Sequence, residues 1–278
     1  MLNNAMLFFY LTLTLSCPVY ALDFDFKKAL DVVKKVQQAA KPLEEPQEIE
    51  LGNGIAANLL GASPLFNDND VQQYINKVGR WLSLQTERPD LPWKFGILES
   101  SDVNAFATPG GTIFITRGLL QKLNNESELA GVLAHEIVHV LRKHHLAALQ
   151  KEARMDLASD LVGKAIKGET NPALEKAIKA GTEVYARGLD KNDEFEADRM
   201  GIVIATRAGY DPYGLPAVLQ MLDASNAQDS SLALMFKTHP PPRDRLSLLD
   251  KIMDNRFDAY SAPTQTDERF NSEVSRHK

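Results

Sequence analysis

Two histidines and a glutamate within one helical turn could together bind a metal ion and activate a water molecule. His135, Glu136 and His139 form the pattern His-Glu-x-x-His. Residues four apart share a helical face, so His135 and His139 can bind one Zn²⁺ side by side. Glu136 lies next to them and can take the proton of a metal-activated water. The pattern indicates zinc-dependent hydrolysis; the alternative is a helix with two partly exposed histidines and a surface glutamate.

A catalytic zinc needs a third protein ligand, which these two histidines do not supply. His144 and His145 are the nearest candidates in the sequence. On an unbroken helix, however, their side chains project away from the face that carries His135 and His139. We therefore expect His144 and His145 to lie on the helix surface or behind the ligands.

An acidic segment further along the chain offers a better third ligand. Glu194 and Asp198 are four residues apart and share one face of an expected helix. Glu194 could bind the metal, while Asp198 could accept the second imidazole N–H of a ligating histidine. Taken alone, the segment is better interpreted as a solvated helix start with favourable negative charge. Beside the His-Glu-x-x-His helix, the ligand interpretation is favoured.

The elements that must position these residues follow from hydrophobic periodicity and from capping residues. The pattern predicts an α+β fold that is mainly helical, with a small antiparallel β-sheet. A strand is expected at 93–98 and a β-hairpin at 103–116, with Pro109-Gly110-Gly111 in its turn. Helices are expected at 24–40, at 71–82 after an N-cap within 67–70, at about 125–150, from 192 or 193 to 208, and at 213–224.

The composition is that of an ordinary globular protein, and it argues against one class of partner. The 278 residues are 44% hydrophobic and 24% charged, with a net charge of −6. Because no basic block stands out, we expect no binding to nucleic acid.

The N-terminus reads as an export signal. Residues 5–22 are apolar or hydroxylic, and small residues precede a cleavage site after Ala21. The first four residues lack the usual Lys or Arg, so an uncleaved anchor is the alternative, and Cys17 offers a weak lipoprotein site. Cleavage after Ala21 would leave no cysteine, which suits an exported protein. The expected organisation is a signal peptide at 1–21, a helix and acidic linker at 22–50, a zinc metallopeptidase domain at 51–250 and a disordered polar tail at 251–278.

Several segments besides the metal motif carry a family resemblance. They are 59–65 leading into 73–76, 102–107, 194–199 and 238–240. Together with the His-Glu-x-x-His helix they resemble the envelope-associated gluzincin metallopeptidases, the family of the HtpX and Oma-type proteases. The resemblance is strongest to the periplasmic BepA/LoiP-like members and covers roughly 50–250. It implies a zincin-like metalloprotease domain.

The resemblance implies roles for individual residues. The two motif histidines and Glu194 would bind one zinc ion per chain, with Glu136 as the general base. His239 is similar to a histidine that can approach the zinc from a loop and hold the enzyme shut; the alternative is an exposed histidine in the rigid turn 239–242. Arg245 matches an arginine that the family tends to carry near the site, and the expected catalytic residues are Glu136, His239 and Arg245.

The expected reaction is hydrolysis of peptide bonds in an extended chain. Such a chain would pair through its backbone with an edge strand, for which 111–116 is the expected segment. Asn104 and Ala105 would shape the same cleft, or else pack the hairpin. The expected substrate-binding residues are Asn104, Ala105, Gly111, Thr112, Ile113, Phe114 and Ile115.

Backbone pairing tolerates many side chains, so the expected substrates are unfolded or misassembled envelope proteins. The resemblance places the protein in the periplasm, soluble or attached to the membrane, and adds the outer-membrane assembly machinery as a candidate partner. The chain shows no long helical-repeat extension after the expected domain, which weakens that last expectation. The alternative function is a zinc-stabilised chaperone or assembly factor that binds chains without cutting them efficiently.

Overall fold

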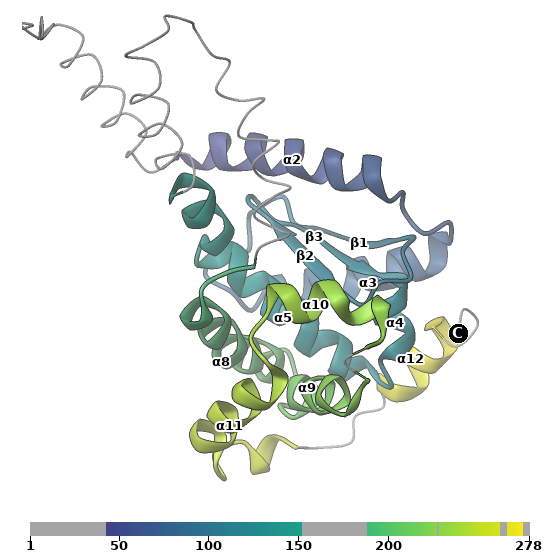
Figure 1. Ribbon diagram of the computed structural model, residues 1–278, viewed down its shortest axis with the longest axis vertical. Coiled ribbons are helices and arrows are strands. Elements are labelled where there is room, and N and C mark those ends of the chain that lie inside the picture. The colour runs from purple at the N-terminus through teal and green to yellow at the C-terminus, as the bar shows by residue number, and fades with distance from the viewer. Residues whose placement is uncertain (1–42, 152–187, 227, 262–265, 275–278) are drawn as a thin grey trace, which may run out of the picture.

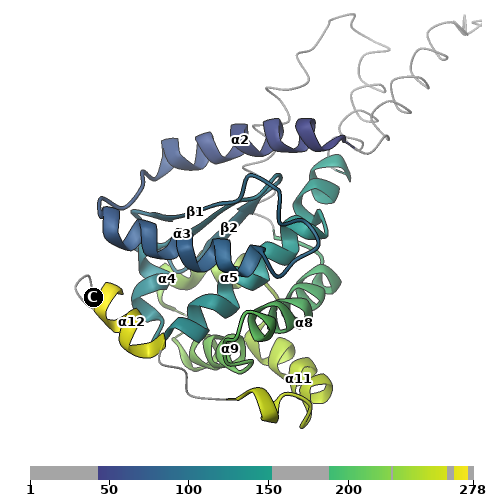
Figure 2. The ribbon, with the colours of Figure 1, turned by 180° about the vertical axis from the view of Figure 1, so that it is seen from behind.

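The computed structural model describes residues 43–151, 188–226, 228–261 and 266–274. The expected signal peptide and the helix at 24–40 lie outside these residues, as does most of the Ala/Lys-rich region from 150 to 181. Helices surround a small sheet, and the fold class α+β is confirmed (Figures 1 and 2). No helix within the described ranges is both long enough and apolar enough to cross a membrane.

Helix α5 (Glu126–Leu141), which carries the His-Glu-x-x-His motif, forms the centre of the molecule. All 16 of its residues are buried, between the sheet on one side and helices α8 (Lys191–Arg207) and α9 (Gly214–Ala224) on the other (Figure 1). Its first turn is capped by Asn125, whose side chain accepts a hydrogen bond from the Glu128 N–H at 2.8 Å. The predicted start of this helix is therefore confirmed.

The end of α5 differs from the prediction of one helix running to about residue 150. The helix stops at Leu141, Lys143 has a φ of 57°, and a new helical segment begins at His144. A left-handed lysine costs about 1 kcal/mol relative to a glycine. The ammonium of Lys143 lies 2.8 Å from a carboxylate oxygen of Glu48, a buried residue distant in sequence. We attribute the break to this contact, because the sequence around it contains no glycine or proline.

The sheet contains three described strands in the order β1-β3-β2. Strands β2 (Ala105–Thr108) and β3 (Thr112–Thr116) form the predicted hairpin, whose turn has positive φ at both glycines, 110 and 111. Strand β1 (Lys94–Leu98) pairs with β3 in parallel, so the sheet is mixed and only the hairpin is antiparallel. Strand β3 is consequently the central strand, hydrogen-bonded on both edges.

Helices cover both faces of the sheet. Helix α3 (Asn69–Ser83), capped by Asp68, buries the predicted apolar face against β1 and α5. Helix α2 (Glu45–Ala62) packs on the opposite face, against Phe106, Phe114 and Leu98 (Figure 2). The predicted linker through residue 50 is therefore wrong, since α2 already begins at Glu45, with a proline in its first turn. Helix α4 (Arg117–Lys122) follows β3 directly.

The C-terminal part supplies the remaining helices of the site, and three α-helices described there, at 233–238, 242–253 and 266–274, were not predicted from the sequence. The elements are α8 (Lys191–Arg207), α9 (Gly214–Ala224), η1 (Ser230–Leu232), α10 (Ala233–Thr238), α11 (Pro242–Met253), η2 (Asp258–Tyr260) and α12 (Thr266–Val274).

Helix α12 contradicts the prediction that 251–278 is a disordered tail. Phe270 and Val274 are buried in the main core, at 0% and 1% exposure. Arg269 forms an ion pair with Glu126, at the start of α5. The segment looks disordered in sequence because its few apolar residues are spaced among charges, yet those residues are the ones that face the core.

Candidate metal centre

Three side chains from two helices converge on one point. The Nε2 atoms of His135 and His139, one turn apart on α5, lie 3.0 Å from each other. The carboxylate of Glu194 on α8 reaches both rings, with each Nε2 atom 3.6 Å from one of its oxygens. The structure thus brings together the three residues predicted as metal ligands, and all three are buried.

The close approach of α8 to α5 makes this convergence geometrically feasible. A Cβ atom at Gly201 would lie 3.0 Å from the backbone nitrogen of His135, so this glycine sits where the two helices touch. The N-cap of α8 is Asp190, whose side chain accepts from the Asn192 N–H at 2.9 Å. Because the helix starts there, Glu194 falls in its first turn, beside the histidines.

The donor set fits a divalent cation such as zinc. Tetrahedral Zn²⁺ with ligand bonds of about 2.0–2.1 Å places neighbouring donor atoms roughly 3.3 Å apart. The distances of 3.0 and 3.6 Å bracket that value. Among the described residues, Oε2 of Glu194 is buried without a hydrogen-bond partner. A buried carboxylate oxygen is costly to leave in that state, and a cation between the rings would satisfy it.

A buried ion pair holds the far side of the His135 ring. Oδ1 of Asp198 lies 3.0 Å from Nδ1 of His135. Arg245 on α11 donates to both oxygens of Asp198, through Nε at 2.8 Å and through Nη2. Burial raises the pKa of Asp198, but the guanidinium and His135 outweigh burial and lower it to about 2. For His135, burial lowers the pKa, while hydrogen bonds to Asp198 and Glu194 outweigh it and raise the value to about 9. Asp198 therefore stays anionic and fixes the orientation of His135.

Arg245 was expected as a catalytic residue, and its place in the structure suits a different task. Its charged group contacts Asp198 and lies 3.4 Å from Nδ1 of His135, the ring nitrogen that faces away from Glu194. From there it can position Asp198 and, through it, the ring of His135.

Glu136 lies in the same cleft and carries an unusual proton affinity. It is 4% exposed and lines the cleft together with His139, Glu194 and His239. Burial raises its pKa to about 7, with the negative charge of Glu194 adding to the effect and His135 opposing it. A carboxylate with this pKa can both accept and return a proton near neutral pH.

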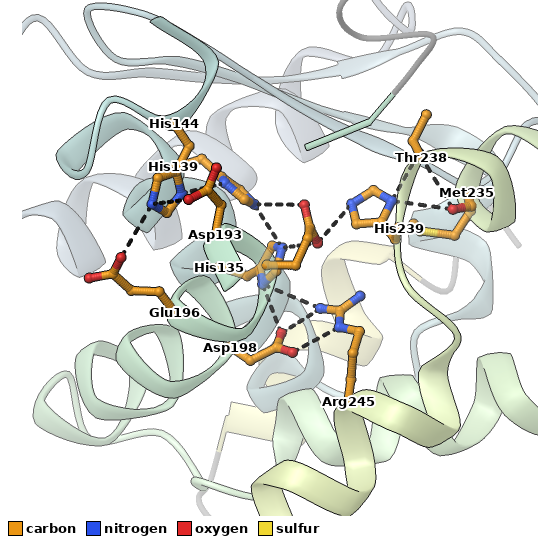
Figure 3. Close-up of polar contacts among 11 residues, drawn as sticks. His135, His139, His144, Asp193, Glu196, Asp198, Met235, Thr238, His239 and Arg245 are labelled. Atoms are coloured by element: carbon orange, nitrogen blue, oxygen red, sulfur yellow. Dashed lines mark hydrogen bonds and ion pairs between the residues drawn. The ribbon is translucent and has the colours of Figure 1, made fainter. Parts of the chain in front are cut away.

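His239 approaches the donor set from the other side. It follows α10, and its Nε2 lies 3.7 Å from Oε2 of Glu194 (Figure 3). Its Nδ1 lies 2.9 Å from the hydroxyl of Thr238 and 3.3 Å from the carbonyl oxygen of Met235, which together hold the ring. The alternative of an exposed histidine in a turn is contradicted by this placement, since the side chain is only 15% exposed.

The break after α5 changes the position of two further histidines. Nδ1 of His144 lies 3.0 Å from Nδ1 of His139, and the ring centroid of His145 lies 5.3 Å from that of His139. His145 also lines the cleft. The expectation that both project away from the motif face assumed an unbroken helix and is wrong, because the turn at Lys143 directs them back. Of the two placements expected for them, His144 adopts the one behind the ligands.

The predicted substrate-binding residues separate into two groups. Asn104 and Ala105 line the cleft, and Phe106, which the sequence did not indicate, lines it with them. The segment predicted as the edge strand, 111–116, does not line the cleft, because β3 is the central strand of the sheet. The parallel pairing of β1 with β3, which local periodicity does not reveal, leaves β2 as the edge strand beside the cleft. Within the described part of the chain, Oδ1 of Asn104 is a second buried acceptor without a hydrogen-bond partner.

Comparison with known proteins places this geometry in a family context. The model of peptidase family M48 matches residues 67–253. The chain is 30% identical, over 248 residues, to the beta-barrel assembly-enhancing protease of Escherichia coli K12, covering 84% of this chain and 51% of that protein. It is 33% identical to the protein of the same name from Yersinia pestis, covering 75% and 44%. It is 26% identical to the mitochondrial metalloendopeptidase OMA1 of Schizosaccharomyces pombe, covering 64% and 52%. The chain spans about half the length of these relatives.

Proposed function

The chain belongs to peptidase family M48, and we propose that it is a zinc-dependent endopeptidase of the bacterial envelope. The resemblance to the envelope gluzincin family is confirmed by this membership and by the Oma-type relatives. One observation carries the proposal most directly. The buried carboxylate of Glu194 faces the Nε2 atoms of His135 and His139 with one oxygen each, and the oxygen beside His135 has no hydrogen-bond partner among the described residues; the carboxyl of Glu136 lies in the same cleft.

The mechanism assigns each group a separate task. His135, His139 and Glu194 would hold the metal, and zinc bound there would supply a Lewis acid that polarises the scissile carbonyl and acidifies water. Glu136, whose carboxyl lies in the same cleft, takes the proton from the attacking water and delivers it to the leaving amine. Asp198 holds the ring of His135 so that its Nε2 stays directed at the donor set.

The substrate chain would pass Asn104 and Ala105, where β2 begins at the border of the cleft. Oδ1 of Asn104 is placed to accept a backbone N–H of the substrate, which supports a role beyond packing the hairpin. Recognition through the backbone ignores most side chains. The proposed substrates are accordingly unfolded or misassembled envelope proteins, and the name of the bacterial relatives supports the outer-membrane assembly pathway as the setting.

His239 is proposed as a latch. Its Nε2 already lies beside the carboxylate of Glu194, where an additional ligand would block access of water and substrate. The predicted His239→Ala outcome is higher turnover of an unfolded substrate such as casein, with zinc still bound. A fall in turnover at unchanged zinc content would instead assign the histidine to the transition state.

The domain and location proposals follow the sequence. Residues 1–21 are proposed as a signal peptide cleaved on export to the periplasm. The peptidase domain was expected at 51–250, and the packing of α2 and α12 on the core supports somewhat wider limits, from Glu45 to Val274.

The test of the proposed function is Glu136→Gln in the full chain. The substitution preserves shape and removes the base, so we expect about one zinc per chain, as in the parent protein, and a loss of casein cleavage by at least ~10²-fold. Retained cleavage in a clean preparation would refute the mechanism. A parent protein that binds casein without cutting it would favour the zinc-stabilised chaperone instead.

A further inference from the structure

The two histidine ligands have different partners on their outer nitrogens. His135 faces the carboxylate of Asp198, as described above. His139 faces a histidine: its Nδ1 lies 3.0 Å from Nδ1 of His144, with the two rings inclined at 71°. His144 is 5% exposed, so this contact is sheltered from bulk water. The contact involves the one ring nitrogen of His139 that does not point at Glu194.

The positions of the protons in this pair follow from the donor set. Nε2 of His139 faces His135 and Glu194, so when it acts as a ligand the proton of the neutral ring must be on Nδ1. That N–H then donates to Nδ1 of His144, which must be unprotonated to accept it. His144 consequently carries its own proton on Nε2.

Two acidic side chains on α8 face that last proton. Oε2 of Glu196 lies 3.4 Å from Nε2 of His144, and Oδ1 of Asp193 lies 3.7 Å from it (Figure 3). Either carboxylate favours a proton on this nitrogen. Hydrogen-bond donation therefore runs in one direction, from His139 to His144 and from His144 to the carboxylates of α8.

His144 reaches this position because of the left-handed turn that ends α5. Lys143, at φ 57°, is anchored by its ammonium to Glu48 on α2 at 2.8 Å. Glu48 is buried and also accepts from Arg88 at 3.0 Å and from the N–H of Gly110 at 3.3 Å. The turn is thus tied to α2, to the segment before β1 and to the hairpin. A turn anchored at this many points sets the ring of His144 in one place.

We propose that His144 is a positioning residue for the metal centre, which fixes the tautomer and ring orientation of His139 through its Nδ1 atom. The proposal rests on the proposed zinc site and adds a residue to it. Partners of this kind on a ligating histidine typically contribute about 10- to 100-fold to metal affinity. His144 thus does for His139, as a neutral acceptor, what Asp198 does for His135 as an anion.

A matched pair of substitutions separates the hydrogen bond from packing. Asparagine places its Oδ1 near the position of Nδ1 in histidine, so His144→Asn keeps an acceptor for His139. His144→Leu has nearly the same shape as asparagine and accepts nothing. Zinc affinity of the full chain, measured by competition with a chelator, should fall about 10- to 100-fold in His144→Leu and stay within about threefold of the parent in His144→Asn.

A second measurement reads the geometry of the site directly. The visible absorption bands of the Co²⁺-substituted protein should shift in His144→Leu and return in His144→Asn, while the thermal unfolding of the metal-free proteins stays similar. Equal zinc affinity in the parent and His144→Leu would overturn the inference, and so would equal losses in both variants. A parent protein that binds no zinc would refute the proposed metal site itself, and the inference with it.

Discussion

Replacing Arg245 by methionine should destabilise the protein strongly, because it isolates a buried charge. The side chains of Arg245 and its partner Asp198 are only 5% and 1% exposed. Methionine fills similar space without a charge, so the variant leaves Asp198 with the His135 ring as its remaining described partner. Breaking a buried pair from one side typically costs about 3–5 kcal/mol.

The pKa of Asp198 gives an independent scale for this cost. Its value of about 2, against 3.8 for an ordinary aspartate, means that the folded state favours the anion by about 2 kcal/mol even after burial has opposed it. A depressed carboxyl pKa stabilises the fold above pH 3.8 and loses that contribution as the pH falls through about 2. Burial raises the pKa of Asp198, and Arg245 is the largest of the causes that lower it. The difference in the free energy of unfolding between the parent and Arg245→Met should therefore be largest at pH 7 and should decrease as acid protonates Asp198.

The assay is urea unfolding of the metal-free proteins, with Arg243→Met as the control. Arg243 lies on the same helix, is 79% exposed and pairs with Asp223 at 3.3 Å, so its loss should change the free energy of unfolding by less than about 1 kcal/mol. We expect Arg245→Met to lose several times more, and Arg245→Met combined with Asp198→Asn to recover part of the loss. Equally small losses of unfolding free energy in Arg245→Met and Arg243→Met would refute the reasoning. So would a difference between the parent and Arg245→Met that increases in acid.

Three other outcomes follow from the structure. In the metal-free protein, the carboxyl of Glu136 should take up its proton as the pH falls through about 7, because burial raises its pKa to that value; an infrared carboxylate signal, present in the parent and absent in Glu136→Gln, that disappears only near the ordinary carboxyl pKa would contradict this. Phe270→Ala should lower the free energy of unfolding by about 3–5 kcal/mol, because its ring is 0% exposed. Tyr260→Ala, at a residue 60% exposed, is the control, and equal small effects would mean that α12 does not pack on the core. Gly188→Ala should disturb the loop of His239, since a Cβ at position 188 would lie 2.2 Å from the carbonyl oxygen of the residue just before His239. Unchanged turnover and stability would argue against that contact.

Local patterns in the sequence determined the chemistry of this protein. The spacing of His135 and His139, the capping by Asn125 and Asp68, and the glycine turn of the hairpin each act within a few residues. Interactions of that range are encoded by neighbouring side chains, so periodicity and capping rules suffice to predict them. Glu194 and Asp198, four residues apart on α8, could be predicted from the sequence for the same reason.

The tertiary structure decided what those elements face. The parallel pairing of β1 with β3 placed the predicted substrate strand in the centre of the sheet. Phe270, in a segment predicted to be disordered, is buried in the main core. Glu48, 95 residues before Lys143, holds the left-handed turn that sends His144 back to His139. A sequence records which side of an element is apolar or charged, but the partner that satisfies it is set by contacts between distant segments. The ligands of this site and Asp198 could be predicted from the sequence, whereas the contact of His144 with His139 depends on a turn that only the fold reveals.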